Sequence, residues 1–210
     1  MGVFENRADA GRQLLEKIGR EDVYDLVLGV PRGGIPVAAV VSRGLRLPLH
    51  AALSNKIRAP WNPELAVGAV GEDGSALKDP DTDARGLLND EEFKIAKNEA
   101  MAELRRRIDL YGSIGDDVRD KRVLLVDDGA ATGLTLRASL LSLRNMGAGW
   151  LSVALPVASP NAAETLREES DETLILIVPV IFRAVGQFYR NFGPVRDGEV
   201  LDHLWRNPYE

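Results

Sequence analysis

Residues 123–135 read Val-Leu-Leu-Val-Asp-Asp-Gly-Ala-Ala-Thr-Gly-Leu-Thr, and this stretch does most to decide the fold. Its first four residues are apolar and lie between Lys121-Arg122 and two adjacent aspartates. A short apolar run of this kind is typical of a strand that is buried on both faces of a parallel sheet. Small residues follow, and residues 133–146 then have the apolar spacing of a helix. The stretch therefore predicts a strand, a tight loop and a helix.

The same alternation extends to both sides of this stretch. The expected elements are, in chain order, a helix at 5–19, a strand at 25–30, a helix at 35–44, a strand at 49–54, a helix capped by Asn89 and Glu92 that ends before Gly112, strand 123–126, helix 133–146, strand 151–157, a helix from Ser159-Pro160 and a strand at 173–178. Strands that alternate with helices favour an α/β fold. We expect one domain with a central, mainly parallel sheet of about five strands, helices on both faces, and a ligand site at the carboxyl ends of the strands.

Residues 55–88 have a different character. They contain prolines, glycines and acidic residues around Leu65–Val70, and we interpret them as a β-hairpin or a mobile excursion outside the core, with the mobile part at about 60–88.

Composition and charge limit the kinds of function. The chain has 210 residues, 45% of them hydrophobic, and no cysteine, which excludes disulfides, cysteine nucleophiles and cysteine zinc sites. Its two histidines, His50 and His203, are expected to be structural or exposed. A net charge of −6 argues against nucleic-acid binding as the main task. No apolar run is long enough for a bilayer and no secretory signal opens the chain, so we expect a cytoplasmic protein without membrane contact.

The loop after the apolar strand combines the features of an anion site and of a hydroxyl site. Its small residues are Gly129, Ala130, Ala131 and Gly133, and its hydroxyl side chains are those of Thr132 and Thr135. Small residues let backbone N–H groups approach a ligand, and the helix that follows favours an anion at its N-terminus. Asp127 and Asp128 would repel a second phosphate but can accept hydrogen bonds from hydroxyl groups. A phosphate beside a vicinal diol describes a ribose 5-phosphate; the alternative is an ordinary β–α turn with solvated aspartates.

Residues 123–135 resemble the phosphoribosyl diphosphate (PRPP) signature of the type I phosphoribosyltransferases, in which four apolar and two acidic residues precede a small-residue loop ending in Thr-Gly. The resemblance covers most of the chain. Residues 29–34 lie where the family has its pyrophosphate loop, and 65–85 where it has a mobile hairpin that closes over the site. Residues 179–210 and the N-terminal segment correspond to a small hood, whose part at 179–189 receives the base. The resemblance is closest to bacterial members with Val-Pro-Arg-Gly-Gly, Lys-x-x-Ala-Pro and Asp-Asp-Gly-x-Ala-Thr-Gly, whose acceptor is not defined.

This resemblance implies Mg²⁺-dependent transfer of a phosphoribosyl group from PRPP to an acceptor, a nucleobase or similar nitrogen heterocycle, with release of pyrophosphate. Asp127 and Asp128 would bind the ribose hydroxyls, and residues 129–135 would hold the 5-phosphate. Mg²⁺ would be held mainly through PRPP, with Asp127 or Asp128 as the candidate protein ligands. The family also implies a homodimer.

Further candidates surround this loop. The residues expected to meet pyrophosphate are Arg32, Gly33, Gly34, Lys56 and Arg58, of which Arg32 and Lys56 join Asp127 and Asp128 as candidate catalytic residues. Lys56 and Arg58 could equally lie on a solvated edge. The residues that could stack on a flat acceptor are Phe182, Phe188 and Tyr189. The run Arg105–Arg107 is expected on a solvated helix face, paired with Glu103.

One position departs from the family pattern. Purine-salvage members carry a loop aspartate that serves the base, and this chain has Ala131 there, so the loop offers no group for proton transfer. Two other functions stay open. The protein could be a PRPP- or nucleotide-binding regulator with little or no turnover, or a phosphosugar or nucleotide hydrolase that uses the same pair of aspartates.

Overall fold

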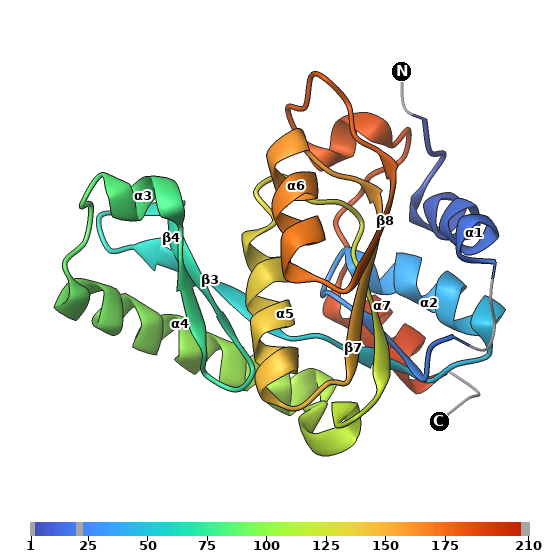
Figure 1. The fold of residues 1–210 in the computed structure, drawn as a ribbon, viewed down its shortest axis with the longest axis horizontal. Helices are drawn as coiled ribbons and strands as arrows, with labels where there is room; N and C mark the ends of the chain where they lie inside the picture. The colour runs from blue at the N-terminus through green and yellow to red at the C-terminus, as the bar shows by residue number, and fades with distance from the viewer. Residues whose placement is uncertain (1–2, 20–22, 207–210) are drawn as a thin grey trace.

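The computed structural model describes residues 3–19 and 23–206, and its centre is a parallel sheet of five strands in the order β2-β1-β6-β7-β8 (Figure 1). These strands are β1 (Leu26–Gly29), β2 (Leu49–Ala51), β6 (Arg122–Val126), β7 (Trp150–Val157) and β8 (Glu172–Ile177). Every pairing is parallel, and Gly29 of β1 lies beside Val126 of β6. The predicted α/β fold with a parallel sheet of about five strands is confirmed.

Helices cover both faces of this sheet. The helices of the core are α1 (Arg7–Ile18), α2 (Gly34–Leu45), α5 (Leu134–Asn145), α6 (Pro160–Glu169) and α7 (Asp197–Trp205), with the short 3-10 helices η1 (Gly115–Val118) and η2 (Val185–Phe188) between them. Leu124 packs on the side of α1 and α2, and Leu125 on the side of α5 and α6. Successive strand residues point to opposite faces, so a strand covered on both faces must be apolar throughout.

A second, antiparallel sheet extends from the core, to the left in Figure 1. We call residues 54–111 the arm. Its elements are β3 (Ser54–Ala59), β4 (Asn62–Gly71), β5 (Ala76–Lys78), α3 (Pro80–Ala84) and α4 (Asp90–Tyr111). The expected strand at 49–54 is divided, because β2 ends at Ala51 and Ser54 begins β3 in the other sheet.

The arm corrects one expectation and confirms another. Strands β3 and β4 form the predicted hairpin. The expectation that residues 55–88 lie outside the core is wrong, because Val67, Ala69 and Val70 of β4 are at most 2% exposed. They pack against α4 on one side and α5 on the other, which explains the apolar run at 65–70. The mobility of residues 60–88 stays a prediction.

Helix α4 joins the arm to the site. Its N-terminus has the predicted capping box, in which the side chains of Asn89 and Glu92 each accept a hydrogen bond from the other residue's backbone N–H at 2.9 Å. Ala96, Ala100 and Leu104 form the buried face of α4. Residues three apart lie on one face of a helix, so Arg107 follows Leu104 toward the start of β3.

The first described residues pack against the segment that follows β8. Phe4 pairs with Tyr189 in a β-bridge, and the N–H groups of Val3 and Phe4 donate to the carbonyl of Phe188 at 2.9 Å. Residues 1–2 and 207–210 of the expected hood lie outside the described residues.

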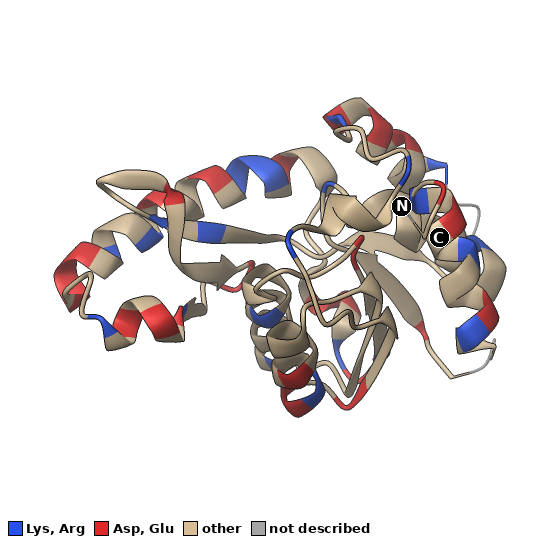
Figure 2. Ribbon diagram, turned by 90° about the horizontal axis from the view of Figure 1, so that it is seen from above, with Lys and Arg blue, Asp and Glu red and all other residues tan. Residues whose placement is uncertain are grey.

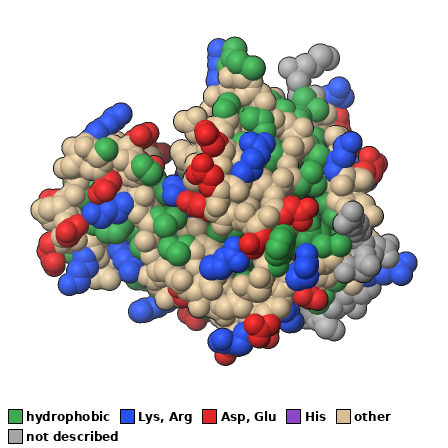
Figure 3. Space-filling view, viewed as in Figure 1, with side chains coloured by type: hydrophobic (Ala, Val, Ile, Leu, Met, Phe, Trp, Pro, Cys, Tyr) green, Lys and Arg blue, Asp and Glu red, His purple; other side chains and the backbone are tan. Residues whose placement is uncertain are grey.

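Charged residues are interspersed over the surface. Figure 2 shows Lys and Arg alternating with Asp and Glu along the helices of both arm and core, and the face in Figure 3 has the same mixture. Within residues 3–19 and 23–206, no helix combines the length and apolar character needed to cross a membrane.

Candidate functional site

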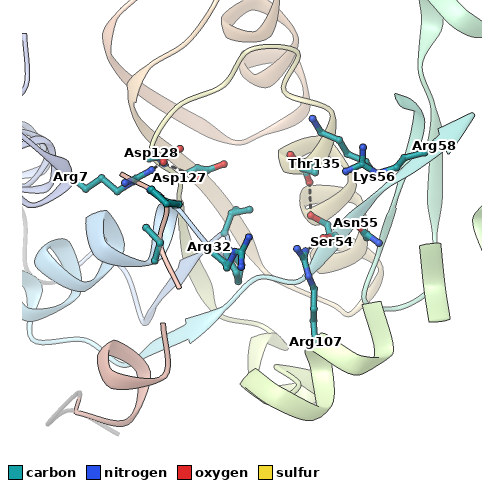
Figure 4. A pocket seen from close by; sticks show the side chains of 15 residues that line it. Arg7, Arg32, Ser54, Asn55, Lys56, Arg58, Arg107, Asp127, Asp128 and Thr135 are labelled. Carbon is teal, nitrogen blue, oxygen red and sulfur yellow. Dashed lines mark hydrogen bonds and ion pairs between the residues drawn. The ribbon is translucent and has the colours of Figure 1, made fainter. Parts of the chain in front are cut away.

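A cavity of about 390 Å³ opens at the carboxyl edge of the central sheet. Its walls come from the turn after β1, the loop after β6, the adjoining parts of β3 and α4, and the segment before α7. Because parallel strands end at one edge, the topology brings the first two walls together. The side chains labelled in Figure 4 are those of Arg7, Arg32, Ser54, Asn55, Lys56, Arg58, Arg107, Asp127, Asp128 and Thr135. All four predicted catalytic residues are among them.

The aspartate pair forms the core wall of this cavity. Asp127 follows the last residue of β6, and its Oδ1 accepts a hydrogen bond from the backbone N–H of Asp128 at 2.8 Å. Burial and the neighbouring carboxylate raise the pKa of Asp127 well above its ordinary value. Burial also raises the pKa of Asp128, and the guanidinium of Arg7 opposes this rise. The pair is thus a partly desolvated acceptor site.

The turn after β1 lies against this pair. A Cβ at Gly33 would lie 2.1 Å from Oδ2 of Asp128, and a Cβ at Gly34 would lie 2.8 Å from the Cα of Asp127. Only glycine allows this approach, so both glycines have a packing role beside the pyrophosphate role predicted for them. The peptide bond between Pro31 and Arg32 in this turn is cis.

Arg7 is a site residue that the sequence analysis did not identify. Its Nε lies 2.8 Å from Oδ2 of Asp128, and both side chains are about one-eighth exposed, at 12% and 13%. Its Nη1 donates to the carbonyl of Gly193 at 2.8 Å, and its Cζ lies 4.0 Å from the ring centroid of Phe192. Arg7 therefore connects α1, the aspartate pair and the segment before α7.

The loop after β6 contributes fewer side chains to the cavity than predicted. Thr135 lines it, whereas Thr132 is exposed and its Oγ1 accepts a hydrogen bond from the N–H of Leu134 at 3.4 Å. Ala130 is buried and its N–H donates to the carbonyl of Val157, so it supports the loop and has no N–H free for a phosphate. Gly133 has a φ of 71° and caps α5, whose first turn carries no acidic residue.

The remaining loop residues, Ala131 and Gly129, contact neighbouring segments that hold the loop in place. Ala131 is exposed, and its carbonyl accepts a hydrogen bond from Ser159 Oγ at 2.6 Å. A Cβ at Gly129 would meet Val185 Cγ1 at 2.7 Å, so this position is confined by the hood segment. The loop is thus held from β7, α6 and the hood, and it leads into the N-terminus of a twelve-residue helix that suits an anion.

The arm forms a cationic wall. Lys56 and Arg58 project from β3 and line the cavity, and Nη1 of Arg58 donates to the carbonyl of Pro63. Arg107 reaches the same cavity from α4, where its Nη1 lies 3.5 Å from the carbonyl oxygen of Ser54. Within the described part of the chain, none of these three cations forms an ion pair. Lys56 and Arg58 are exposed and also line the cavity, so both interpretations of them stay open.

The placement of Arg107 corrects the expectation that Arg105–Arg107 is a solvated run paired with Glu103. Arg105 and Arg106 are exposed as expected, but Arg107 lines the cavity. Glu103 instead accepts a hydrogen bond at 3.2 Å from Nδ2 of Asn55, a buried residue of β3. The reason is the helical period, which turns the third arginine toward β3.

Arg32 lies between the core and arm walls. Its Nη1 is 3.5 Å from Oδ1 of Asp197, and both side chains are about half exposed. The hydroxyl of Tyr111, the last residue of α4, donates to the same carboxylate oxygen. Asp197 thus joins the Arg32 turn to the end of the arm helix.

The aromatic residues proposed to receive the acceptor pack against other aromatic rings instead. Phe188 and Tyr189 are only 8% and 5% exposed. The ring of Tyr189 lies 5.3 Å from that of Phe4 and 4.8 Å from that of Phe192, and Phe182 lies 5.7 Å from Phe188. The hydroxyl of Tyr189 donates to the carbonyl of Asp128 at 2.6 Å. The expectation of acceptor stacking on Phe188 and Tyr189 is therefore wrong, and Phe182 does not line the cavity.

The histidines have no place in this cavity. His50 lies in β2 and His203 in α7, and neither lines it. Burial lowers the pKa of His203. This agrees with the expectation that both are structural or exposed.

A parallel sheet with an aspartate pair and a small-residue loop at its carboxyl edge has the arrangement of α/β proteins that bind ligands where their strands end. Residues 4–189 match the model of the phosphoribosyl transferase domain, and the chain belongs to that family.

Relatives agree with this assignment. Two curated proteins from Mycobacterium tuberculosis strains CDC 1551 and H37Rv, each named a "putative phosphoribosyl transferase", are 35% identical over 209 residues, which is 98% of this chain and 47% of theirs. The chain thus spans about half the length of these relatives. The crystal structure of TT1426 from Thermus thermophilus superposes with a TM-score of 0.78 at 37% identity, covering 97% of this chain and 98% of that one.

Proposed function

We propose that the protein transfers a phosphoribosyl group from PRPP to a nitrogen acceptor, a nucleobase or similar heterocycle, and releases pyrophosphate. The observation that carries this proposal is the division of one cavity into two chemically opposite walls. Asp127 and Asp128 lie on the core side, and the cations Lys56, Arg58 and Arg107 lie on the arm side (Figure 4). A ribose needs hydrogen-bond acceptors and a diphosphate needs cations, so PRPP suits both walls at once.

In the proposed reaction, the bond from ribose C1 to the diphosphate oxygen breaks through an oxocarbenium-like state, and a nitrogen lone pair of the acceptor forms the new bond. The aspartates orient the ribose, and Arg32 with the arm cations stabilises charge on the departing diphosphate. Closure of the hairpin at about 60–88 over the site would exclude water from the reactive carbon. Since Ala131 offers no proton-transfer group, an acceptor that is already deprotonated or needs no such help fits best.

The donor set suits Mg²⁺ bound largely through the substrate. Mg²⁺ is commonly held by one or two carboxylates together with phosphate oxygens and waters. Asp127 and Asp128 supply two adjacent carboxylates, and the described residues contain no group of three or more ligating side chains. The ion would be held mainly through PRPP, with Asp127 or Asp128 as the candidate protein ligand, and it would neutralise part of the diphosphate charge.

Two further points carry over from the sequence analysis, the first of them from the family resemblance. We propose that the protein works as a homodimer and that it acts in the cytoplasm. Sedimentation velocity tests the dimer, and a single monomeric species at micromolar concentration would contradict it.

Calorimetric titration with PRPP, with and without Mg²⁺, tests the donor site, and a panel of bases assayed for pyrophosphate release tests turnover. Mg²⁺-dependent binding with base-dependent pyrophosphate release would support the proposal. Tight binding without release across the panel would favour a regulatory protein. Phosphate release from phosphosugars or nucleotides without PRPP would favour a hydrolase, and no PRPP binding under either condition would overturn the proposed donor.

A further inference from the structure

The carboxylates of Asp127 and Asp128 each have one oxygen already engaged. Oδ1 of Asp127 accepts the backbone N–H of Asp128, and Oδ2 of Asp128 accepts Nε of Arg7, both at 2.8 Å. Apart from the backbone N–H of Asp128, which also lies near its own carboxylate, no described group donates to Oδ2 of Asp127 or to Oδ1 of Asp128. Two acceptor oxygens, one on each of two neighbouring residues, therefore remain for a ligand, and this number matches the two hydroxyls of a vicinal diol.

The position of Arg7 determines which carboxylate oxygen of Asp128 is engaged and which is left for a ligand. The terminal torsion of an aspartate is broad, so an unpartnered carboxylate can rotate and exchange its two oxygens. Arg7 is itself fixed in three ways, through Asp128, through the carbonyl of Gly193 and by lying over the ring of Phe192. A planar guanidinium held at several points constrains direction as well as charge. In Figure 4 the Arg7 side chain points at Asp128 from the side of α1.

We propose that Arg7 is a positioning residue that holds Asp128 with Oδ1 free to accept a hydrogen bond from a ribose hydroxyl, and so helps the site to select a sugar with both hydroxyls. The inference rests on the proposed function. Arg7 contacts the carboxylate of Asp128 directly, so the proposed effect on the ribose passes through Asp128. A purely structural role, such as tying α1 to the hood, predicts instead a loss of stability that is independent of Asp128.

The test is a double-mutant cycle between these two residues, read by calorimetric binding of ribose 5-phosphate. Arg7→Gln removes the charge and the Nε contact, and we expect affinity to fall about tenfold. In the Asp128→Asn background the same substitution should change affinity less than about twofold, because the group it positions is gone. Affinity for inorganic pyrophosphate should stay within about twofold, since pyrophosphate has no hydroxyls to offer.

Matched variants complete the test. Arg12→Gln is the control in α1, because Arg12 pairs with Asp9 away from the cavity, and it should leave binding unchanged. Arg7→Lys keeps the charge and should recover part of the loss; it also keeps the test decisive if Arg7→Gln does not fold. Affinity for 2-deoxyribose 5-phosphate, relative to ribose 5-phosphate, should differ less in Arg7→Gln than in the unchanged protein.

The outcomes separate the two proposals. An equal loss of ribose 5-phosphate affinity in the presence and absence of the Asp128 carboxylate would overturn the positioning role. A folded Arg7→Gln or Arg7→Lys variant would also overturn it if its affinity and its discrimination against 2-deoxyribose 5-phosphate were unchanged. If the unchanged protein binds neither ribose 5-phosphate nor PRPP, the proposed function fails and this inference fails with it.

Discussion

The core wall and the arm wall of the cavity present opposite charges on differently built supports. The aspartate pair extends from β6, a parallel strand covered by helices on both faces. The cations Lys56, Arg58 and Arg107 extend from an antiparallel hairpin and one long helix that stand beside the core (Figure 1). The comparison teaches that the acceptor oxygens belong to the central parallel sheet, whereas the cations belong to a second sheet and a helix that pack against it through α5.

The largest effect is expected at the core wall. Asp127→Asn combined with Asp128→Asn should weaken PRPP binding by at least about a hundredfold, because both acceptor carboxylates are lost. The fold should persist, since the change removes two like charges from a partly buried site, and circular dichroism with calorimetric titration checks both points. Asp116→Asn with Asp117→Asn changes another adjacent pair, at the surface, and is the control. Near-normal affinity in a folded core-wall variant would contradict the assignment of the pair.

The next effect concerns the attachment of the arm. Leu104 is fully buried between α4 and β3, and Leu104→Ala should lower the free energy of unfolding by about 3 kcal/mol. Leu110 of the same helix is 41% exposed, so Leu110→Ala should cost less than about 1 kcal/mol. Urea unfolding measures both. A loss below about 1 kcal/mol for Leu104→Ala would mean that α4 does not hold the arm together.

A smaller effect is expected at the arm wall, and it should depend on whether the ligand contains a diphosphate. Arg107→Gln should weaken binding of PRPP and of pyrophosphate about tenfold and leave ribose 5-phosphate unchanged, because Arg107 lies on the cationic wall. The adjacent, exposed Arg106→Gln is the matched control. Should ribose 5-phosphate weaken as much as pyrophosphate, the division of the cavity into two walls would be wrong.

The smallest effect is on the pH dependence of the unliganded protein. Burial and Asp128 raise the pKa of Asp127, so the folded state keeps a proton that the unfolded state has lost. The free energy of unfolding should therefore fall as pH rises from about the ordinary aspartate value of 3.8 through the raised pKa of Asp127. Asp127→Asn should flatten this decline in thermal unfolding measured across that range, and a steeper decline in the variant would contradict the shift.

An ion pair in the arm should give a pH dependence of the free energy of unfolding with the opposite sign, and the same thermal unfolding experiment measures it. Lys78 lowers the pKa of the exposed Asp90 by a hydrogen bond and by its charge. The stability from this pair is present above the ordinary pKa of aspartate and is lost as pH falls through the lowered value. Asp90→Asn should thus leave the decline above pH 3.8 in place, which distinguishes it from Asp127→Asn.

Local patterns made the core predictable. The apolar run of β6, the capping box at Asn89 and Glu92, and the Ser159-Pro160 helix start all depend on residues close together in sequence. Asp127, Asp128 and Arg32 could be placed because each closely follows a core strand. Their meeting at one edge follows from parallel topology.

The missed residues depend on contacts between distant segments. Arg7 is an ordinary charged residue at a helix start, and only the fold brings it to Asp128. Arg107 could have been separated from Arg105 and Arg106 by continuing the helical period from Leu104. Tyr189 carried no local sign that Phe4 would pack on its ring, and Phe188 carried none that it would be buried in the same cluster. The sequence thus predicted which loop residues form the site, but it did not predict which residues from other segments contact those loops.

The contact between Gly33 and Asp128 has a consequence for any redesign of this protein. A side chain at position 33 would overlap a carboxylate oxygen, so residue 33 cannot be enlarged unless residue 128 is shortened or its loop is moved. The two positions are far apart in the chain, but because they are in contact they must be changed together. A mutant library that varies the turn after β1 and the loop after β6 separately would therefore miss the variants in which a larger residue 33 is accommodated by a change at residue 128.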